Sequence, residues 1–235
     1  MDYKEYKSGE SIFKHFWHRG RRDLLYTLVL KLKKKNLRIL NLGAGTGDDL
    51  EVLNNFGEVY VIDIEKRALD LIPKELYKEK KVCDACDLSY NDNFFDAIIS
   101  SDVFEHIKDH KKAFEESYRV LKKGGYLIFA VPAFQFLYSS HDRALEHKRR
   151  YSKKILRNLL KQFNELELNY WNFFLSLPQG IIKFKNRNAK PKVDSPNFPL
   201  SINNIFYQLL RIENYLIKKN FRLPFGLTII GIYQK

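Results

Sequence analysis

Cysteine is nearly absent from the sequence, which holds two, Cys83 and Cys86, among 235 residues. Two cysteines cannot form a disulfide scaffold, and their C-x-x-C spacing lacks the second pair of ligands that a structural zinc site needs. We therefore expect two reduced thiols.

Long hydrophobic runs are also missing. The two longest, residues 24–32 and 227–233, are too short to cross a bilayer core of roughly 30 Å. The N-terminal residues show no apolar core of a signal peptide. From these two absences we expect a cytoplasmic protein without a transmembrane segment.

Glycine and proline are sparse, at 11 and 7 residues, which excludes collagen-like and low-complexity chains. Hydrophobic residues make up 45% and charged residues 29%, a balance typical of a globular chain with a real core. We find no internal repeat and no linker in the sequence. The length then predicts a single domain over residues 1–235.

The charge is mostly of one sign. Lys and Arg total 41 against 28 Asp and Glu, a net charge of +13, and the excess gathers in residues 19–38, 143–161 and 183–192. Such stretches attract the phosphates of nucleic acids, of membrane lipids or of an anionic small molecule. The base composition of a genome also produces Lys-rich sequences, so the charge alone names no partner.

Strand and helix patterns alternate along the first half of the chain, after one or two amphipathic helices expected within residues 11–35. Strands are expected at residues 38–42, 58–63, 81–83, 95–100 and 126–131, and helices at 48–55, 66–71 and 111–121. This alternation implies right-handed crossovers and a parallel sheet covered on both faces.

Beyond Pro132 the pattern changes to a loop rich in aromatic and charged residues. Then come a helix at 152–162 with Ser152 as its N-cap, a strand at 166–173 where we expect the sheet to end, a polar loop at 184–199, a helix at 203–218 and a last β-rich run at 227–233. Together these patterns predict a Rossmann-like, doubly wound α/β fold. We expect a mostly parallel seven-stranded sheet with an N-terminal helical lid and a C-terminal helical elaboration.

Gly43, Gly45 and Gly47 follow the first expected strand, where an open α/β sheet binds its ligand. A dinucleotide fingerprint needs a small sixth residue, which here is Asp48, and a Walker loop needs Gly-Lys-Ser/Thr, which the sequence lacks. NAD and nucleoside triphosphates are therefore disfavoured. A purely structural turn is the alternative.

The stretch Leu40-Asn-Leu-Gly-Ala-Gly-Thr-Gly resembles the first motif of class I S-adenosylmethionine-dependent methyltransferases. Further segments resemble that family in the same order: the acid Asp63, Asp84-Ala-Cys-Asp-Leu, Asn93-Phe-Phe-Asp-Ala-Ile-Ile-Ser, and Phe104-Glu-His-Ile with Arg119-Val-Leu-Lys-Lys-Gly-Gly-Tyr-Leu. The resemblance covers about residues 38–132 and implies S-adenosylmethionine as the cofactor. It divides the chain into a lid (1–36), a cofactor-binding half (37–133) and an acceptor-side half (134–235).

The resemblance also implies which residues bind the cofactor: Gly43, Ala44, Gly45, Gly47, Asp63, Ile64, Asp84, Ala85 and Ser101. A carboxylate accepts well from two hydroxyls, so Asp63 suits a ribose, with a solvated acid as the alternative. Asp84 suits an adenine amino group, with a backbone N–H of Ala85 or Cys86 on a ring nitrogen, or else caps a turn. Asn41 departs from the family, because many relatives carry an acid there that faces the methionine amino group.

Methyl transfer needs a base only if the acceptor keeps its proton. His106, after the fourth strand, is the first candidate and His141 the second. The alternative for Glu105 and His106 is that the pair caps and orients the next helix.

Residues 138–152 are dense in groups that could bind an acceptor, and the His-x-Arg-Arg-Tyr stretch within them resembles that of bacterial and archaeal methyltransferases of glycan and lipid pathways. The candidates are Tyr138, Asp142, His147, Arg149, Arg150 and Tyr151. The spacing of His141, Asp142 and His147 fits no standard zinc pattern, so we expect no metal ion. A solvated loop is the alternative.

The aromatic and basic residues 13–22 are similar to the opening of the same subgroup, which folds over the cofactor as a lid. The helical spacing of Phe13, Phe16 and Trp17 is equally typical of core packing.

The sequence thus favours methyl transfer to a hydroxyl, amine or carboxylate of a small-molecule, lipid or saccharide acceptor. An anionic acceptor and peripheral contact with a membrane are compatible with the basic charge. A nucleic-acid substrate is the alternative that the charge favours, but Ser100-Ser-Asp-Val replaces the Asn/Asp-Pro-Pro-Tyr/Phe turn, and neither cysteine adjoins a proline. A non-catalytic cofactor-binding module is the third possibility. The sequence carries no signal for the oligomeric state.

Overall fold

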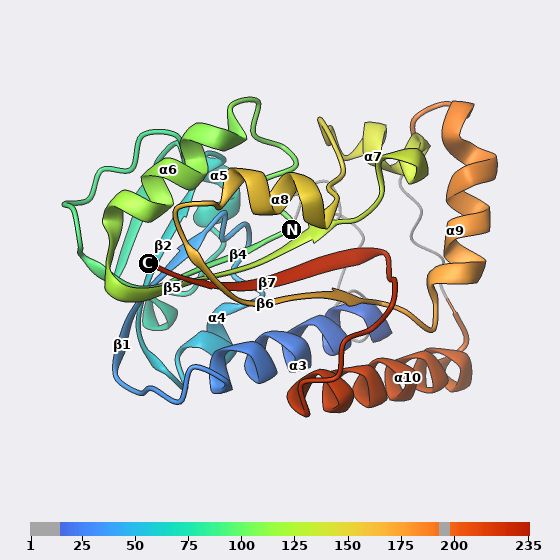
Figure 1. The fold of residues 1–235 in the computed structure, drawn as a ribbon, viewed down its shortest axis with the longest axis horizontal. Helices are drawn as coiled ribbons and strands as arrows, with labels where there is room; N and C mark the ends of the chain where they lie inside the picture. The colour runs from blue at the N-terminus through green and yellow to red at the C-terminus, as the bar shows by residue number, and fades with distance from the viewer. Residues whose placement is uncertain (1–14, 193–197) are drawn as a thin grey trace.

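A computed structural model describes residues 15–192 and 198–235, and over these residues it shows one seven-stranded sheet with helices on both faces (Figure 1). The strands are β1 (Leu37–Leu42), β2 (Gly57–Asp63), β3 (Glu79–Val82), β4 (Phe95–Ser101), β5 (Leu121–Pro132), β6 (Asn164–Trp171) and β7 (Thr228–Gln234). Their order across the sheet is β3-β2-β1-β4-β5-β7-β6. The pairs from β3 to β5 are parallel, whereas β7 is antiparallel to both β5 and β6. The predicted doubly wound α/β fold is confirmed.

The helices form a layer on each face of this sheet. They are α3 (Phe16–Leu30), α4 (Leu50–Leu53), α5 (Lys66–Leu69), α6 (His110–Val120), α7 (Ser140–Ala144), α8 (Lys153–Leu159), α9 (Ser176–Lys185) and α10 (Leu200–Lys218), with single 3-10 turns at Lys74–Leu76, Gln135–Leu137 and Asn186–Asn188. Helices α3, α4 and α10 pack into one apolar core, and α6 and α8 pack into the other. Because both faces are covered, the central strands are buried along nearly their whole length.

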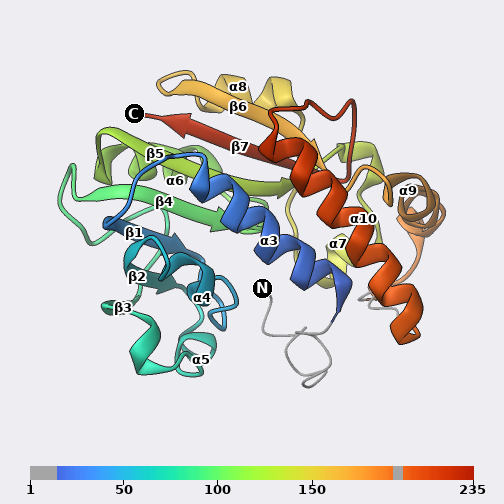
Figure 2. The same ribbon diagram turned by 90° about the horizontal axis from the view of Figure 1, so that it is seen from below.

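Helices α3 and α10 run side by side across one face of the sheet (Figure 2). Their backbones approach closely at Gly20, where a Cβ atom would lie 2.5 Å from the Leu210 side chain. The Asn214 amide donates to the Gly20 carbonyl at 2.9 Å, and Asn203 Oδ1 accepts from the Phe16 N–H at 2.8 Å. Helix α3 is therefore part of the core.

This packing bears on the predicted lid. Phe16 is buried in the core, as the packing alternative expects. Phe13 and the other residues of segment 1–14 lie outside the described residues. The lid over the cofactor stays a prediction.

Three features of the second half differ from the sequence expectations. The sheet does not end in chain order at residue 173, because β7 inserts between β5 and β6 and leaves β6 at the edge. Helix α9 reaches Lys185, and a 3-10 turn follows at Asn186–Asn188, where the polar loop from residue 184 was expected. Helix α7 lies in a segment expected to be a loop. Ser152, in contrast, is confirmed as the N-cap of α8, because its side chain accepts from the Ile155 N–H at 3.3 Å.

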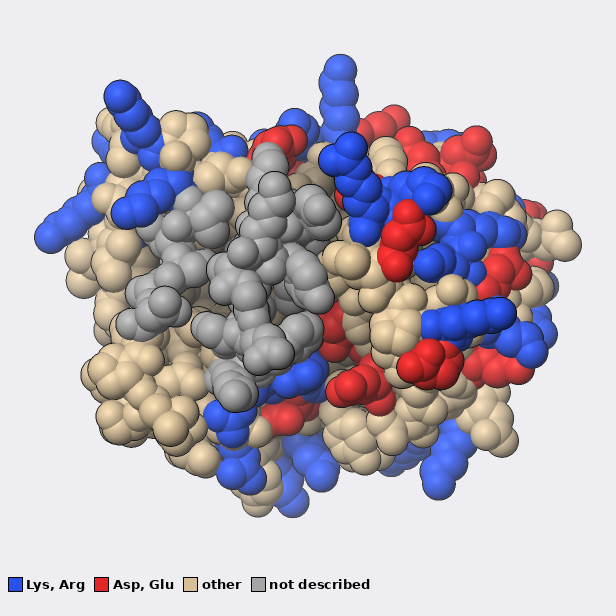
Figure 3. Space-filling view, turned by 180° about the vertical axis from the view of Figure 1, so that it is seen from behind, with Lys and Arg blue, Asp and Glu red and all other residues tan. Residues whose placement is uncertain are grey.

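Two surface properties follow from the same arrangement. On the face shown in Figure 3, Asp and Glu side chains lie among the Lys and Arg side chains. Among the described helices, none has the length and apolar character that crossing a bilayer requires.

Candidate active site

A cavity of about 770 Å³ opens at the carboxyl ends of β1, β2, β3 and β4, which is where an open α/β sheet places its ligand. Its size is within the roughly 300–1,000 Å³ typical of small-molecule sites. Its lining comprises Leu42, Gly43, Gly45, Ile62, Asp63, Ile64, Glu65, Ala68, Cys83, Asp84, Ala85, Cys86, Asp102, Val103, His106, Ile107, Lys108, Asp109, Leu145 and Glu146.

The glycine loop forms the floor where β1 ends. Gly43, Gly45 and Gly47 have φ angles of +74°, +54° and +89°, in the left-handed region that favours glycine. A Cβ atom at Gly43 would lie 2.3 Å from a Val103 methyl group, so a side chain there would collide with the other wall. The N–H groups of Gly43 and of the next residue both donate to the Ile62 carbonyl at 2.9 Å, which ties the loop to β2.

Asp63 holds this loop in place at the end of β2. Its Oδ2 accepts from the Gly45 N–H at 2.8 Å, and its Oδ1 accepts from the Glu65 N–H at 2.9 Å. Each carboxylate oxygen has a second lone pair, and the carboxylate borders the cavity. Asp63 is therefore oriented to accept from two further donors, such as the vicinal hydroxyls of a ribose.

Asp84 lies after β3 on the neighbouring wall. Its Oδ1 accepts from the Cys86 N–H at 2.8 Å, so Asp84 caps a turn, which was the alternative for this residue. The Ala85 N–H is then the candidate donor to a ligand. Both cysteines are free thiols, as predicted. Burial, reinforced by the Asp84 charge, raises the pKa of Cys86 to about 11, so its thiol is protonated and weakly nucleophilic at neutral pH.

The charged side chains around the cavity are mostly acidic. They are Asp63, Glu65, Asp84, Asp102, Asp109 and Glu146, against Lys108. Such a lining attracts a cation and repels a pyrophosphate. Burial raises the pKa of the Asp102 carboxyl group, and the charge of the Arg21 guanidinium offsets part of this rise.

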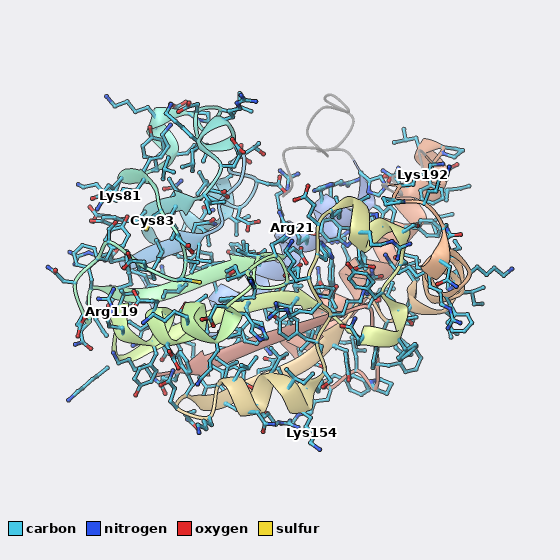
Figure 4. All side chains as sticks on the ribbon, turned by 90° about the horizontal axis from the view of Figure 1, so that it is seen from above. Arg21, Lys81, Cys83, Arg119, Lys154 and Lys192 are labelled. Carbon is cyan, nitrogen blue, oxygen red and sulfur yellow. The ribbon has the colours of Figure 1, made fainter. Side chains whose placement is uncertain are left out.

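Helix α3 is joined to the glycine loop through Asp48. Arg21 Nη2 donates to Asp48 Oδ2 at 2.7 Å and lies 3.1 Å from an Asp49 oxygen. Although burial raises the pKa of Asp48, the His18 ring 3.5 Å away and the Arg21 guanidinium hold that pKa well below the usual range. Figure 4 places Arg21 near the middle of the molecule, away from Lys154 and Lys192 at its edges. The sequence identified Asp48 as incompatible with NAD but did not indicate this structural pairing.

Most of the predicted cofactor-binding residues meet in the cavity. Six of them line it: Gly43, Gly45, Asp63, Ile64, Asp84 and Ala85. The other three lie outside the lining: Ala44 and Gly47 belong to the glycine loop, and Ser101 ends β4. Asn41 is buried within β1 and also lies outside the lining.

The predicted acceptor residues form a buried frame beside the cavity. Asp142, fully buried, accepts from Arg150 Nε at 2.8 Å and Nη2 at 3.0 Å, and its other contacts are His147 Nδ1 at 3.0 Å and Ser139. Although burial raises the pKa of Asp142, the His147 and Arg150 bonds hold it well below the usual range. This segment reaches the cavity through Leu145 and Glu146 instead.

The remaining members of that segment bind main-chain atoms. Tyr151 donates to the Phe104 carbonyl at 2.9 Å, Tyr138 donates to the His147 carbonyl at 2.7 Å, and Arg149 donates to the Lys108 carbonyl at 3.0 Å. The bonds of Tyr151 and Arg149 fasten the segment to the loop after β4, and the Tyr138 bond holds the segment to itself. The solvated-loop alternative is wrong for Asp142, Arg150 and Tyr151, because all three are buried.

Of the two candidate bases, His106 lines the cavity and His141 does not. Burial, with the charges of His147 and Lys183 respectively, lowers the pKa of each to about 3. The helix-cap alternative for Glu105 and His106 is wrong, because α6 is capped by Asp109, whose side chain accepts from the Lys112 N–H at 3.1 Å.

One residue of the site was missed as a functional group. Glu105 is fully buried, and within the part of the chain that the structure describes neither carboxylate oxygen has a hydrogen-bond partner. The sequence offered a signal, because an acid stands directly before the candidate base in the loop that follows β4.

Comparison with known proteins finds chains that are similar to this one over part of its length. Residues 40–129 match the model of a methyltransferase domain. The ubiquinone/menaquinone biosynthesis C-methyltransferase UbiE of Pectobacterium atrosepticum is 30% identical over 132 residues, which are 50% of this chain and 52% of that protein. The chain spans about half the length, or less, of the curated relatives that it matches.

Solved structures share the fold at low sequence identity. A SAM-dependent methyltransferase from Archaeoglobus fulgidus is 19% identical with a TM-score of 0.59, over 91% of this chain and 94% of that one. The phosphoethanolamine N-methyltransferase 2 of Haemonchus contortus, solved with S-adenosyl-L-methionine, is 19% identical with a TM-score of 0.58, over 89% of this chain and 52% of that one.

Proposed function

We propose that the chain, whose residues 40–129 match the model of a methyltransferase domain, is a class I enzyme that transfers a methyl group from S-adenosylmethionine to a hydroxyl, amine or carboxylate of a small-molecule, lipid or saccharide acceptor. The observation that carries the proposal is the joint placement of the glycine loop, Asp63 and Asp84 around one acidic cavity. These residues fit the cofactor, because Gly43 has no room for a side chain and the acids suit hydroxyls and a cation.

Each wall of the cavity has a separate task in this proposal. Asp63 binds the ribose hydroxyls, and Asp84 with the Ala85 N–H binds the adenine. The bound cofactor supplies an electrophilic methyl group on a sulfonium. The chain mainly holds donor and acceptor in line, which is where most of the rate of such a displacement arises.

The acceptor is proposed to enter beside His106, Leu145 and Glu146, on the wall away from Asp63 and Asp84. His106 is neutral at neutral pH because burial lowers its pKa to about 3. A group with so low a pKa takes up a proton poorly, which favours an acceptor that needs no strong base, or one activated by another group.

Helix α9 supports a lipid or lipid-linked acceptor among these classes. Leu177, Ile181 and Phe184 are 67%, 57% and 52% exposed, and Ser176 is the residue of this helix that is buried. Lysines follow in its last turn, and Lys190 and Lys192 lie just beyond. Exposed apolar side chains with adjacent cations suit the surface of an anionic membrane.

The function is tested by incubating the protein with methyl-labelled cofactor and fractionated cell extract. We expect label in a lipid, glycan or small-molecule fraction, and none with the Asp63→Ala variant. The Asp70→Ala variant is the control, because Asp70 pairs with Lys66 on an exposed helix face. Label confined to RNA, or equal labelling by all three proteins, would contradict the proposal.

The membrane surface has its own test, which is sedimentation with vesicles of phosphatidylcholine, alone or mixed with phosphatidylserine. We expect binding to the mixed vesicles, weakened at least about 10-fold by Ile181→Ser, since burying such a side chain contributes about 1.5–3 kcal/mol. Leu166→Ser, an exposed apolar position on β6, is the control. A dimer in solution that Ile181→Ser dissociates would show that a second copy covers α9, and would contradict the membrane contact.

A further inference from the structure

Glu105, His106 and His147 place three potential metal ligands together, and His106 among them lines the cavity. One ligand atom from each side chain lies within 4.8 Å of one from each of the others. The rings of His106 and His147 are perpendicular, with centroids 4.7 Å apart. Around a tetrahedral ion with bonds of about 2.0–2.2 Å, ligand atoms lie about 3.4 Å apart, so small side-chain movements suffice to bind one.

The buried carboxylate of Glu105 is the observation that points to a ligand. In the described part of the chain neither of its oxygens is hydrogen-bonded, and the side chain is shielded from water. An unpaired polar group in such a position costs several kcal/mol, and buried charges are ordinarily paired or bound to metal. A divalent cation between Glu105 and the two imidazoles would remove this cost.

The surroundings of His147 are those of a metal ligand held by a second carboxylate. Its Nδ1 lies 3.0 Å from Asp142 Oδ1, and Asp142 is in turn held by two bonds from Arg150. A carboxylate on one ring nitrogen fixes the orientation and leaves Nε2 free to coordinate.

We propose that Glu105, His106 and His147 form a binding site for a divalent transition-metal ion, with Zn²⁺ as the best match to two imidazoles and one carboxylate. Three protein ligands leave a position open, as in catalytic zinc sites. His106 lines the cavity, so the open position faces the acceptor.

The use of that open position rests on the proposed function. A hydroxyl oxygen of the acceptor bound to the ion loses its proton to solvent more readily, because the metal stabilises the oxyanion. The ion would thus do what His106, with its low pKa, does poorly as a base. This assignment differs from the sequence expectation of no metal, because the three ligands come from two segments that meet through tertiary contacts.

The test is metal binding by the full chain in the absence of any methyl donor. Protein stripped with a chelator is titrated with Zn²⁺ by calorimetry and with Co²⁺ by visible absorption. We expect one ion per chain and the Co²⁺ bands of nitrogen and oxygen ligands. Glu105→Gln and His147→Gln should each lower the affinity at least about 100-fold. His110→Gln, at the start of α6 and outside the cluster, should leave the affinity unchanged.

Three results would overturn the site: no binding of either ion, equal affinity in the Glu105→Gln variant, or sulfur-to-cobalt charge-transfer bands that assign the ion to Cys83 and Cys86. Glu105→Gln replaces the buried carboxyl group with a neutral side chain of the same shape and is expected to fold, which circular dichroism checks. Calorimetry of S-adenosylmethionine with the same variants separates the two proposals. Variants that lose metal binding but keep their affinity for S-adenosylmethionine support the metal site. If the metal site proves wrong, the proposed cofactor site is unaffected.

Discussion

Arg21 on α3 donates a 2.7 Å hydrogen bond to Asp48, the residue that follows the glycine loop, and both side chains are buried. The bond joins the N-terminal helix to the loop proposed to hold the cofactor. Because the Arg21 charge also lies near Asp49 and Asp102, one guanidinium balances several acids at this end of the sheet.

Replacing Arg21 should therefore destabilise the whole domain. Arg21→Met removes the hydrogen-bonded partner of buried Asp48 and leaves only the longer contacts with His18 and Arg22, which we expect to cost about 3–5 kcal/mol. Lys66→Met breaks an exposed pair with Asp70 that water screens, so it should change the unfolding free energy far less than Arg21→Met. Urea unfolding at pH 7 measures both, and equal stabilities of the two variants would contradict the pairing.

The adjacent residues Arg149 and Arg150 should behave differently. Arg150→Met breaks both buried hydrogen bonds from Arg150 to Asp142, with an expected loss of about 3–5 kcal/mol of unfolding free energy. Arg149 is partly exposed and donates to one main-chain carbonyl, so Arg149→Met should cost about 0.5–1.5 kcal/mol. Thermal melting of the two variants tests this difference. A larger loss of stability in Arg149→Met than in Arg150→Met would contradict the buried Asp142–Arg150 pairing.

Stability should fall as the pH drops below about 6.5. The pKa of His141 is lowered from its ordinary 6.5 to about 3, so the unfolded chain binds a proton that the folded chain does not in the range between. The stabilising contribution is fully present above pH 6.5 and is lost as the pH falls toward 3, with a slope on the order of 1 kcal/mol per pH unit.

His141→Asn should reduce this slope. The measurement is urea unfolding between pH 7 and 4.5 with a chelator present, so that bound metal ions do not contribute. Asp48 and Asp142 titrate below this window in the folded state because their pKa values are depressed. An unchanged slope in the variant would place His141 in a more solvated environment.

Local sequence predicted the cofactor half of the fold well. A buried strand leading into Gly43, a β-rich run ending at Asp63 and the N-cap Ser152 each depend on residues close together in the chain, and each element is found. The placement of β7 between β5 and β6 depends on pairing between residues such as Ile232 and Ile128, about a hundred positions apart. Strand order of this kind leaves little trace in local patterns.

The acceptor side was harder to predict for a related reason. The polar side chains of Asp142, Arg150 and Tyr151 made them candidates in the sequence. Their burial in contact with each other and with the loop after β4 depends on tertiary structure, which the local sequence does not show. Glu105 is an ordinary acid in the sequence, and it becomes unusual only because its surroundings exclude water and hydrogen-bond partners. Helix α9 was not predicted, although Leu177, Ile181 and Phe184 have the i, i+4, i+7 spacing of a helix, and the structure leaves this apolar face exposed.

The most direct test of the account is isothermal calorimetry of the chain with S-adenosylmethionine and with NAD. Because the cavity is acidic and Asp48 stands where NAD sites need a small residue, we expect S-adenosylmethionine to bind and NAD not to bind. Asp63→Ala should weaken that binding by about 1.5–3 kcal/mol, whereas Asp70→Ala should not change it. Tight NAD binding without a response to S-adenosylmethionine, or an affinity that Asp63→Ala leaves unchanged, would contradict it.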